Sequence, residues 1–360
     1  MEQNVKSPKI LFPITPHTLT GEPPHGSSLN YMSYVLGVDG GGTKTVCVVM
    51  NAQCEVVGRG EAGASNYQSI GVDAALKSIE SAIYAAIEAL KVIGYIQIKA
   101  ICLGLAGVGR PRDIEVIEGI VSNLENNPNL PIQWELASSK TPITESKKNI
   151  IICHDALIAL VGGIGNDVGI VVAAGTGSIV FGRNQQGITK RVGGWGYILG
   201  DEGSGYKIAV AGLQAAMQAY DGRGKFTTLQ EVFKNHLALE SIEDLIEVVY
   251  RRGWGVKEIA ALAIVVDNAA ADGDEVANWI IDDAVRELVK ATSTAIDALT
   301  PIGNDSFEIV TVGSVWSGKS KMVSQFIQSV TSKYRNAKII YPRFEPAYGA
   351  GLLALKQLYS

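Results

Sequence analysis

A pattern of strand, glycine turn and strand occurs twice in this 360-residue chain, and it constrains the fold more than any other feature. The first copy reads YVLGVD, GGGT and KTVCVVM from residue 34, and the second reads VGIVVAA, GTG and SIVFG from residue 168. At one constant offset, without a gap, the copies align Gly42 with Gly175, Thr43 with Thr176, Thr45 with Ser178, Asn51 with Asn184, Gln53 with Gln186 and Gly60 with Gly193. A chain with 40 glycines can match glycines by coincidence, but the strands and both turns match as well. We therefore expect a duplication that gives two related lobes, each built on an antiparallel meander.

Helical periodicity follows both meanders. Apolar residues recur at helical spacing in residues 72–90, and further helices are expected at 204–220, 229–236, 242–250, 256–271, 275–299 and 347–358. Apolar strands precede helices at 100–105, 150–153 and 309–312. This alternation predicts an α/β fold with mixed sheets flanked by helices.

The predicted domain boundaries follow from these patterns. Residues 1–33 are rich in Pro, Ser, Thr and Asn without amphipathic periodicity, so we expect a disordered tail, with Met32 as an alternative start. The N-terminal lobe is expected at 34–157, completed by a C-terminal helix at 346–360, and the C-terminal lobe at 158–345.

Composition excludes several classes of function. The net charge of −5 and the pI near 5.5 argue against a nucleic-acid partner. No apolar run reaches the roughly 20 residues that cross a bilayer, so no membrane partner is expected. The four cysteines form no C-x-x-C motif and the four histidines no metal-binding spacing, which indicates reduced thiols in a cytoplasmic protein without zinc.

The stretch DGGGTKT, residues 39–45, carries the first candidate chemistry. Consecutive glycines at 40–42 let a backbone approach an anion and direct N–H groups at it, while Thr43 and Lys44 add a hydroxyl and an ammonium group. Asp39 ends the preceding strand and is a candidate for holding Mg²⁺ through its water shell. We interpret Gly41, Gly42, Thr43 and Lys44 as an ATP phosphate site rather than an ordinary hairpin.

Two further stretches extend this interpretation. GTGS repeats the phosphate pattern with Gly175, Thr176 and Gly177, so two glycine hairpins could hold one polyphosphate. In ICHDA, Asp155 follows an apolar strand and could simply cap the next helix. Its place between the two hairpins favours a catalytic general base instead.

The segment GGWGYILGDEGSG, residues 193–205, combines glycines around Trp195 with Asp201 and Glu202 before a helix. Structural glycines and helix-capping acids would explain each part separately. The density of the pattern favours a platform that a ligand approaches closely.

The stretch GSVWSGKS, residues 313–320, matches the P-loop pattern G-x-x-x-x-G-K-[ST] letter for letter. A P-loop domain also needs an acid at the end of another parallel strand. Only one strand, 337–341, fits downstream, and it ends at Pro342 without an aspartate. We therefore interpret residues 313–316 as an adenosine-side turn, with Gly318, Lys319 and Ser320 completing the pattern by chance.

Together these stretches resemble the sugar-kinase/Hsp70/actin-like superfamily, most closely its N-acetylglucosamine kinase branch, which shares a domain type with the BadF/BadG-type ATPases. The resemblance covers residues 34–360: DGGGTKT and GTGS resemble its phosphate motifs, ICHDA a connecting motif, IVTVGSVW the adenosine motif and PAYGAGLLAL the closing helix. GGWG with GDEGS is its most specific marker. The resemblance implies the actin-like ATPase (ribonuclease H-like) fold with a nucleotide cleft between the lobes. LGLAGVGRPRD after Cys102 differs from the animal enzymes, which leaves the exact sugar open.

Carried over position by position, the resemblance implies that Thr43 and Thr176 contact ATP phosphates and that Gly313 and Ser317 lie against the adenosine. It implies a sugar pocket lined by Asn66, Asp155, Ser178, Ile179, Gly194, Trp195, Gly196, Asp201 and Gly205.

The implied activity is transfer of the ATP γ-phosphoryl group, with Mg²⁺, to an amino sugar, with N-acetylglucosamine at O6 as the first candidate. Glucosamine phosphorylation, a BadF/BadG-type ATPase that activates another enzyme through a shared iron–sulfur cluster, and a sugar-sensing regulator are the alternatives. A homodimer is a further expectation, because dimers are common among relatives.

Overall fold

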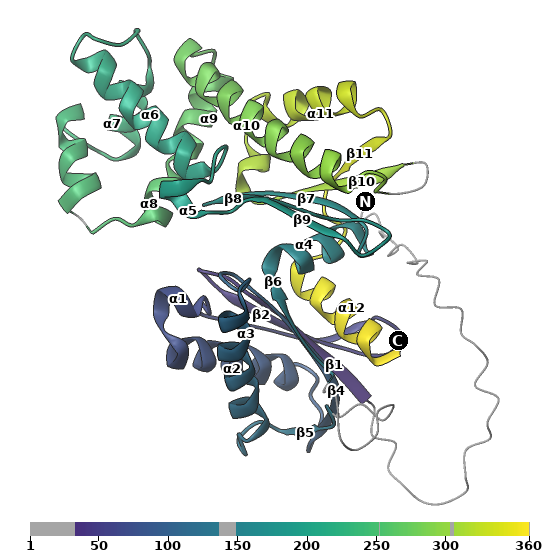
Figure 1. Ribbon diagram of the computed structural model, residues 1–360. Coiled ribbons are helices and arrows are strands. Elements are labelled where there is room, and N and C mark those ends of the chain that lie inside the picture. The colour runs from purple at the N-terminus through teal and green to yellow at the C-terminus, as the bar shows by residue number, and fades with distance from the viewer. Residues whose placement is uncertain (1–32, 137–148, 252, 303–305, 360) are drawn as a thin grey trace, which may run out of the picture. The chain divides into compact units, whose positions relative to one another are not determined.

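The computed structural model describes residues 33–136, 149–251, 253–302 and 306–359, and the predicted tail lies outside these ranges except for Ser33 (Figure 1). The chain divides into two compact units. The first unit ends at Asp155 and resumes at Ala347, and the second spans Ala156–Pro346. The boundaries expected from the sequence, at 157 and 346, lie within two residues of this division.

The first unit is a mixed sheet with helices on both faces (Figure 1). Its strands are β1 (Ser33–Gly40), β2 (Thr45–Met50), β3 (Val56–Ala62), β4 (Ile96–Leu105), β5 (Ile132–Trp134) and β6 (Ile150–His154). Its helices are α1 (Tyr67–Ile70), α2 (Val72–Glu88), α3 (Pro111–Glu125) and α12 (Pro346–Tyr359). The strand order is β3-β2-β1-β4-β5, and β6 also pairs with β4. β1 to β3 form the expected antiparallel meander, while β4 runs parallel to β1, β5 and β6.

Burial on both faces explains the composition of this sheet. All six residues of β2 are buried, as expected for a strand covered on both sides. α2 packs Ile79, Ile83 and other residues at helical spacing onto one face. On the other face α12 approaches so closely that a Cβ on Gly37 would lie 2.3 Å from the backbone nitrogen of Gly351. Glycine is therefore required where α12 crosses β1.

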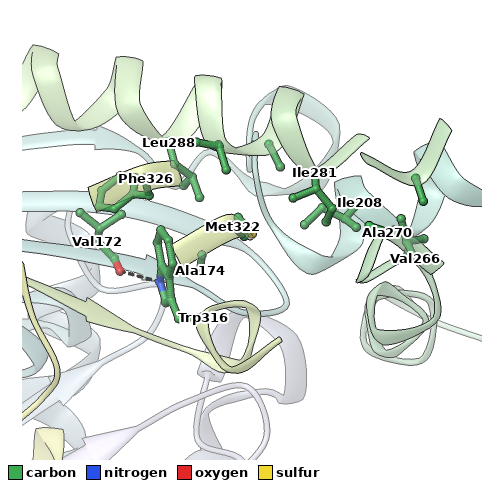
Figure 2. Close-up of a cluster of buried hydrophobic side chains, with 14 of the residues drawn as sticks. Val172, Ala174, Ile208, Val266, Ala270, Ile281, Leu288, Trp316, Met322 and Phe326 are labelled. Atoms are coloured by element: carbon green, nitrogen blue, oxygen red, sulfur yellow. Dashed lines mark hydrogen bonds between the residues drawn. The ribbon is translucent and has the colours of Figure 1, made fainter. Parts of the chain in front are cut away.

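The second unit repeats this plan with additional helices (Figure 1). Its strands are β7 (Gly169–Ala174), β8 (Ser178–Arg183), β9 (Thr189–Gly193), β10 (Phe307–Val312) and β11 (Ala337–Ile340), in the order β11-β10-β7-β8-β9. Its helices are α4 (Asp155–Ile164, whose first residue belongs to the first unit), α5 (Gly196–Leu199), α6 (Gly205–Tyr220), α7 (Leu229–His236), α8 (Val256–Ala261), α9 (Ala263–Ala271), α10 (Glu275–Leu299) and α11 (Met322–Lys333). α4 packs on β7 and β10, and the main cluster of apolar side chains, part of which Figure 2 shows, covers the opposite face.

Two expected helices differ from the structure. Residues 242–250 form a 3₁₀ turn at Ile242–Asp244 and a short π-helix at Glu247–Arg251 instead of one α-helix. Residues 256–271 form two helices that meet at Leu262. Apolar spacing of three and four residues suits each of these helix types, so the pattern predicted helical backbone but not its continuity.

The internal duplication is visible in matching turns. Oδ1 of Asn51 accepts hydrogen bonds from the backbone nitrogens of Gln53 (3.0 Å) and Glu55 (2.9 Å). Oδ1 of Asn184 accepts from the nitrogens two and four residues later in the same way, at 3.1 and 3.0 Å. The same side chain thus closes the same turn in both units.

The strand register corrects the gapless alignment. β1 and β2 pair Gly40 with Thr45 around a turn at residues 41–44, whereas β7 and β8 pair Ala174 with Ser178 around a turn at residues 175–177. The first turn is therefore one residue longer than the second. In space Asp39 corresponds to Ala173, so the second unit carries no counterpart of that acid.

Candidate active site

The first glycine turn is held by backbone hydrogen bonds. The nitrogen of Gly41 donates to the carbonyl of Lys44 (2.9 Å), and the carbonyl of Gly41 accepts from the nitrogens of Ser65 (3.0 Å) and Asn66 (3.2 Å). Gly42 and Thr43 are exposed at the tip of the turn. The turn is therefore fixed at its base while its tip is accessible to a ligand.

Lys44 has a partner within the protein. Its Nζ lies 3.3 Å from Oε2 of Glu61 on β3, and Arg59 contacts the same carboxylate. The side-chain hydrogen bond from Lys44, and to a smaller extent that from Arg59, holds the pKa of Glu61 below its ordinary value. This pair is exposed, so binding of a phosphate can draw Lys44 away at small cost.

The two predicted acids of the first unit lie at the ends of two parallel strands on either side of β4. Asp39 on β1 pairs with Gly104 on β4, and Gly104 pairs in turn with Cys153 on β6, two residues before Asp155. Because β1, β4 and β6 are parallel, both residues lie at the same edge of the sheet, with the backbones of β1 and β6 about 10 Å apart across β4. Oδ1 of Asp155 lies 2.6 Å from Nδ1 of His154. No motif in the sequence marks His154 for a role at this site.

Acidic side chains at this edge suit Mg²⁺ without forming a complete metal site. Among the described residues no group of three or more His, Cys, Asp or Glu side chains is placed to hold a metal ion. Mg²⁺ in phosphoryl-transfer enzymes takes one or two carboxylates and completes its shell with water and phosphate oxygens. Asp39 fits that requirement.

Asn66 caps the short helix α1, accepting a hydrogen bond from the nitrogen of Gln68 (3.1 Å). Gln68 donates through Nε2 to the carbonyl of Gly107 at 2.6 Å. Gly107 has φ of +80°, and a Cβ there would approach Oδ1 of Asn66 to 3.0 Å. Asn66 is thereby joined to the loop that follows β4.

That loop is anchored by the buried carboxylate of Asp113. It accepts from the side chain of Arg110 (2.9 and 3.1 Å), the hydroxyl of Tyr67 (2.6 Å) and the backbone nitrogens of Gly109 and Arg110. The Arg110 guanidinium and these other donors hold the pKa of Asp113 well below its usual range.

We expect Asp113→Asn to destabilise the first unit in a pH-dependent way. Because the folded pKa is depressed, the carboxylate contributes stability above the unfolded pKa of about 3.9, and this contribution is lost as pH falls further. The melting temperature of the variant should lie below wild type at pH 7, and the difference should shrink below about pH 4. Asp73→Asn, an exposed acid in the first turn of α2, is the control. A difference that stays constant with pH would contradict the assignment.

The second glycine turn lies against the start of a long helix. The nitrogen of Gly175 donates to the carbonyl of Gly177 (2.9 Å), and the nitrogen of Gly205, the first residue of α6, donates to the carbonyl of Gly175 (2.8 Å). Thr176 is exposed. The first N–H groups of α6 are used within the protein, because Tyr206 donates to the carbonyl of Thr176 (3.4 Å) and Lys207 to Oγ of Ser204 (3.3 Å). The hydroxyl of Thr176 and the positive end of the helix dipole are therefore the features of this turn that favour a phosphate.

A pocket of about 370 Å³ opens beside this turn within the second unit. It is lined by Gly175, Thr176, Gly205, Ile208, Lys257, Ala260, Ala261, Ala263, Ile264, Asp267, Ile281, Ser314, Val315, Gly318 and Met322. Its size and mostly apolar lining with few polar groups are typical of small-molecule sites. Lys257 and Asp267 were missed by the sequence analysis because nothing near them forms a motif. Gly313 and Ser317 adjoin its lining residues in the chain.

The P-loop letters do not form an open phosphate cradle. The backbone nitrogens of Lys319 (2.5 Å) and Ser320 (3.2 Å) donate to the carboxylate of Asp267 on α9. Residues 314–317 form a 3₁₀ turn whose Trp316 is buried, with Nε1 donating to the carbonyl of Val172 at 3.1 Å (Figure 2). The N–H groups of Lys319 and Ser320, which a P-loop would direct at phosphate, are used inside the protein.

The remaining predicted sugar residues surround the start of β8. Ser178 donates through Oγ to the carbonyl of Glu202 (2.7 Å). Asp201 is buried, and burial raises the pKa of its carboxyl group. A Cβ on Gly177 would lie 2.8 Å from Oδ2 of Asp201, so glycine is needed where the turn passes this side chain.

In the Gly-Trp-Gly segment Gly194 is half-buried, and Trp195 and Gly196 are exposed. Trp195 is 65% exposed, with the guanidinium of Arg191 4.7 Å above its ring. Ser178, Ile179 and Trp195 line a second pocket of about 250 Å³. Gly194, Gly196 and Asp201 are not among its lining residues, and Gly205 lines the larger pocket instead.

Two cysteines that are distant in sequence come together. The sulfurs of Cys102 on β4 and Cys153 on β6 are 4.0 Å apart. Burial, and then the nearby Cys153, raise the pKa of the Cys102 thiol. This pair leaves no motif in the sequence, because the two cysteines lie 51 residues apart on adjacent strands.

Comparisons with known proteins give consistent results. A model of the BadF/BadG/BcrA/BcrD ATPase family matches residues 36–354. The N-acetylmuramic acid/N-acetylglucosamine kinase of Clostridium acetobutylicum is 35% identical over 325 residues, which cover 90% of this chain and 98% of that protein. The N-acetyl-D-glucosamine kinase of Dictyostelium discoideum is 32% identical over 330 residues, covering 89% and 97%.

A solved structure from Chromobacterium violaceum, provisionally assigned as an N-acetylglucosamine kinase, matches with a TM-score of 0.65 at 23% identity. The match covers 89% of this chain and 98% of that one. The predicted fold, with two related α/β lobes, is confirmed. No helix among the described residues is long and apolar enough to cross a membrane.

Proposed function

The chain belongs to the BadF/BadG/BcrA/BcrD ATPase family, and we propose that it is an ATP-dependent kinase that phosphorylates N-acetylglucosamine at O6. The pocket beside Thr176 carries the proposal, because it joins a glycine turn and a helix N-terminus to a mostly apolar chamber large enough for a nucleoside. The two kinase relatives, at 35% and 32% identity over most of the chain, support sugar phosphorylation in particular.

In this proposal Asp155 accepts the proton of the attacking hydroxyl while His154, 2.6 Å from its carboxylate, fixes its orientation. Thr43 and Thr176 donate to phosphate oxygens, and Gly313 and Ser317 lie on the adenosine side. Asp39 holds Mg²⁺ through water, and the ion when bound neutralises phosphate charge. Asn66, Ser178, Ile179, Gly194, Trp195, Gly196 and Asp201 form the sugar pocket.

An ADP-release assay with Mg²⁺ over a panel of sugars tests the proposal. The panel contains N-acetylglucosamine, glucosamine, N-acetylmannosamine, N-acetylmuramic acid and glucose, together with 6-deoxy-N-acetylglucosamine. We expect release with N-acetylglucosamine and a 6-phosphate product by mass spectrometry, and none with the 6-deoxy sugar. ADP release that no sugar in the panel stimulates would contradict the kinase assignment.

The activator alternative depends on cysteines that can bind iron at a surface shared by two chains. The structure brings Cys102 and Cys153 together, but Cys102 is completely buried and burial raises the pKa of its thiol. Cluster ligands are thiolates. This pair is therefore poorly suited to a cluster shared between chains, which favours the kinase. Iron in the purified protein would favour the activator.

Replacing the lysine of the P-loop pattern distinguishes a true P-loop from an adenosine-side turn. We expect Lys319→Ala to change the KM for ATP and kcat by no more than about twofold, the size of an ordinary surface substitution. The side chain is exposed, and the backbone nitrogen of Lys319 binds Asp267 rather than a ligand. Lys321→Ala, also exposed, is the matched control in steady-state kinetics. Loss of most kcat in Lys319→Ala alone would restore the P-loop interpretation.

A further inference from the structure

Asp267 is a buried acid in a helix that is otherwise almost entirely apolar. α9 reads AIVVDNAAA, and Asp267 is 7% exposed. Val266 beside it belongs to the main apolar cluster (Figure 2). Within the described part of the chain no basic side chain forms an ion pair with Asp267. A buried charge without a cation is costly unless hydrogen bonds compensate for it, so this position calls for an explanation.

Backbone donors provide part of that compensation. The nitrogen of Lys319 donates at 2.5 Å, and that of Ser320 lies 3.2 and 3.3 Å from the two carboxylate oxygens. The carboxylate lies so close to Gly318 that a Cβ there would be 2.3 Å from Oδ1. Gly318, the second glycine of the P-loop pattern, therefore leaves room for a carboxylate of the protein itself, that of Asp267, and not for a phosphate.

Asp267 also lines the 370 Å³ pocket, together with Thr176, Ser314 and Val315. A negative charge repels phosphate, so phosphates belong at the Thr176 turn and the nucleoside at the Asp267 end. A carboxylate only accepts hydrogen bonds, at about four lone-pair positions, and the two N–H groups leave capacity for another donor. Vicinal ribose hydroxyls are such donors, and an acid binds them in dinucleotide sites of another fold.

We propose that Asp267 is a specificity-determining residue that holds the turn at residues 313–320 and accepts a hydrogen bond from a ribose hydroxyl of the nucleotide. It selects ribonucleotides over deoxyribonucleotides. Because a nucleotide enters this pocket only if the chain uses ATP, the assignment rests on the proposed function.

Equilibrium binding measured by calorimetry tests this without requiring turnover. The ligands are ADP, 2′-deoxy-ADP and 3′-deoxy-ADP with Mg²⁺, and the proteins are wild type, Asp267→Asn and Asp267→Ala. A hydrogen bond to a charged group changes affinity about tenfold or more, so wild type should bind at least one deoxynucleotide that much more weakly than ADP. We expect this ratio to decrease in Asp267→Asn and to approach one in Asp267→Ala.

Asn keeps one oxygen for the backbone donors, so Asp267→Asn carries the test if the alanine variant does not fold. Asp272→Asn, at the exposed end of the same helix, is the matched control and should keep the wild-type ratio. A purely structural role would weaken all three ligands equally and leave the ratio unchanged, which would overturn the proposal. Wild-type protein that binds none of the ligands would overturn the proposed function itself.

Discussion

Asp155→Asn should lower kcat for sugar phosphorylation by about 10²- to 10⁴-fold, the usual contribution of general acid–base catalysis. The amide has almost the shape of the carboxylate but does not accept a proton. Because ATP affinity is assigned to the glycine turns and the second-unit pocket, the Kd for ATP should change little. Steady-state kinetics and calorimetry on the same preparation separate the two quantities.

Asp155 is also the first residue of α4, where any acid stabilises a helix. Glu275→Gln, an exposed acid in the first turn of α10, is therefore the control for that effect and should leave kcat unchanged. Asp155→Asn protein with most of its activity would show that the base lies elsewhere.

Trp316→Ala should cause the largest loss of stability among the substitutions considered, about 3–5 kcal/mol. The indole is 5% exposed, its ring centroid lies 4.9 Å from that of Phe326, and its Nε1 donates to the carbonyl of Val172 (Figure 2). Removing it leaves a cavity and a buried carbonyl without its donor. The melting temperature of the second unit should fall by about 10 °C in differential scanning calorimetry.

Trp316→Phe separates the two contributions. It keeps an aromatic ring beside Phe326 but removes the N–H group, so the expected cost is that of one unsatisfied acceptor, about 1–3 kcal/mol. Equal losses in Trp316→Phe and Trp316→Ala would show that the hydrogen bond, and not ring packing, dominates. Because Trp316 ties residues 314–317 to β7, both variants should also weaken ATP binding.

The two antiparallel meanders could be predicted from the sequence because they follow from local patterns. Strand alternation, glycine turns and the Asn51 and Asn184 side chains are all determined within a few residues, and the structure repeats them in both units. The extra residue in the first turn could not be found this way. Successive glycines in a sequence do not show which of them pairs across a hairpin.

The features that the sequence analysis missed depend on contacts between distant segments. Asp267 meets the nitrogen of Lys319 from 52 residues away, and Cys102 meets Cys153 across adjacent strands. Neither contact leaves a pattern along the chain. The P-loop pattern shows the opposite kind of error, a local match without the function. Residues 313–320 match the pattern letter for letter, but the N–H groups of Lys319 and Ser320 donate to Asp267 instead of a phosphate.

The path of the chain through the two units has a consequence for truncation. The first unit is discontinuous, because it joins Met1–Asp155 to Ala347–Ser360, and Gly351 of α12 packs on Gly37 and Met50. The second unit is one continuous segment, Ala156–Pro346. A chain cut before residue 347 would therefore contain every residue of the second unit, whereas the face of β1 and β2 under α12 would be uncovered. Exposed apolar surface of this kind favours aggregation, so the damage from such a cut falls on the unit at the other end of the chain.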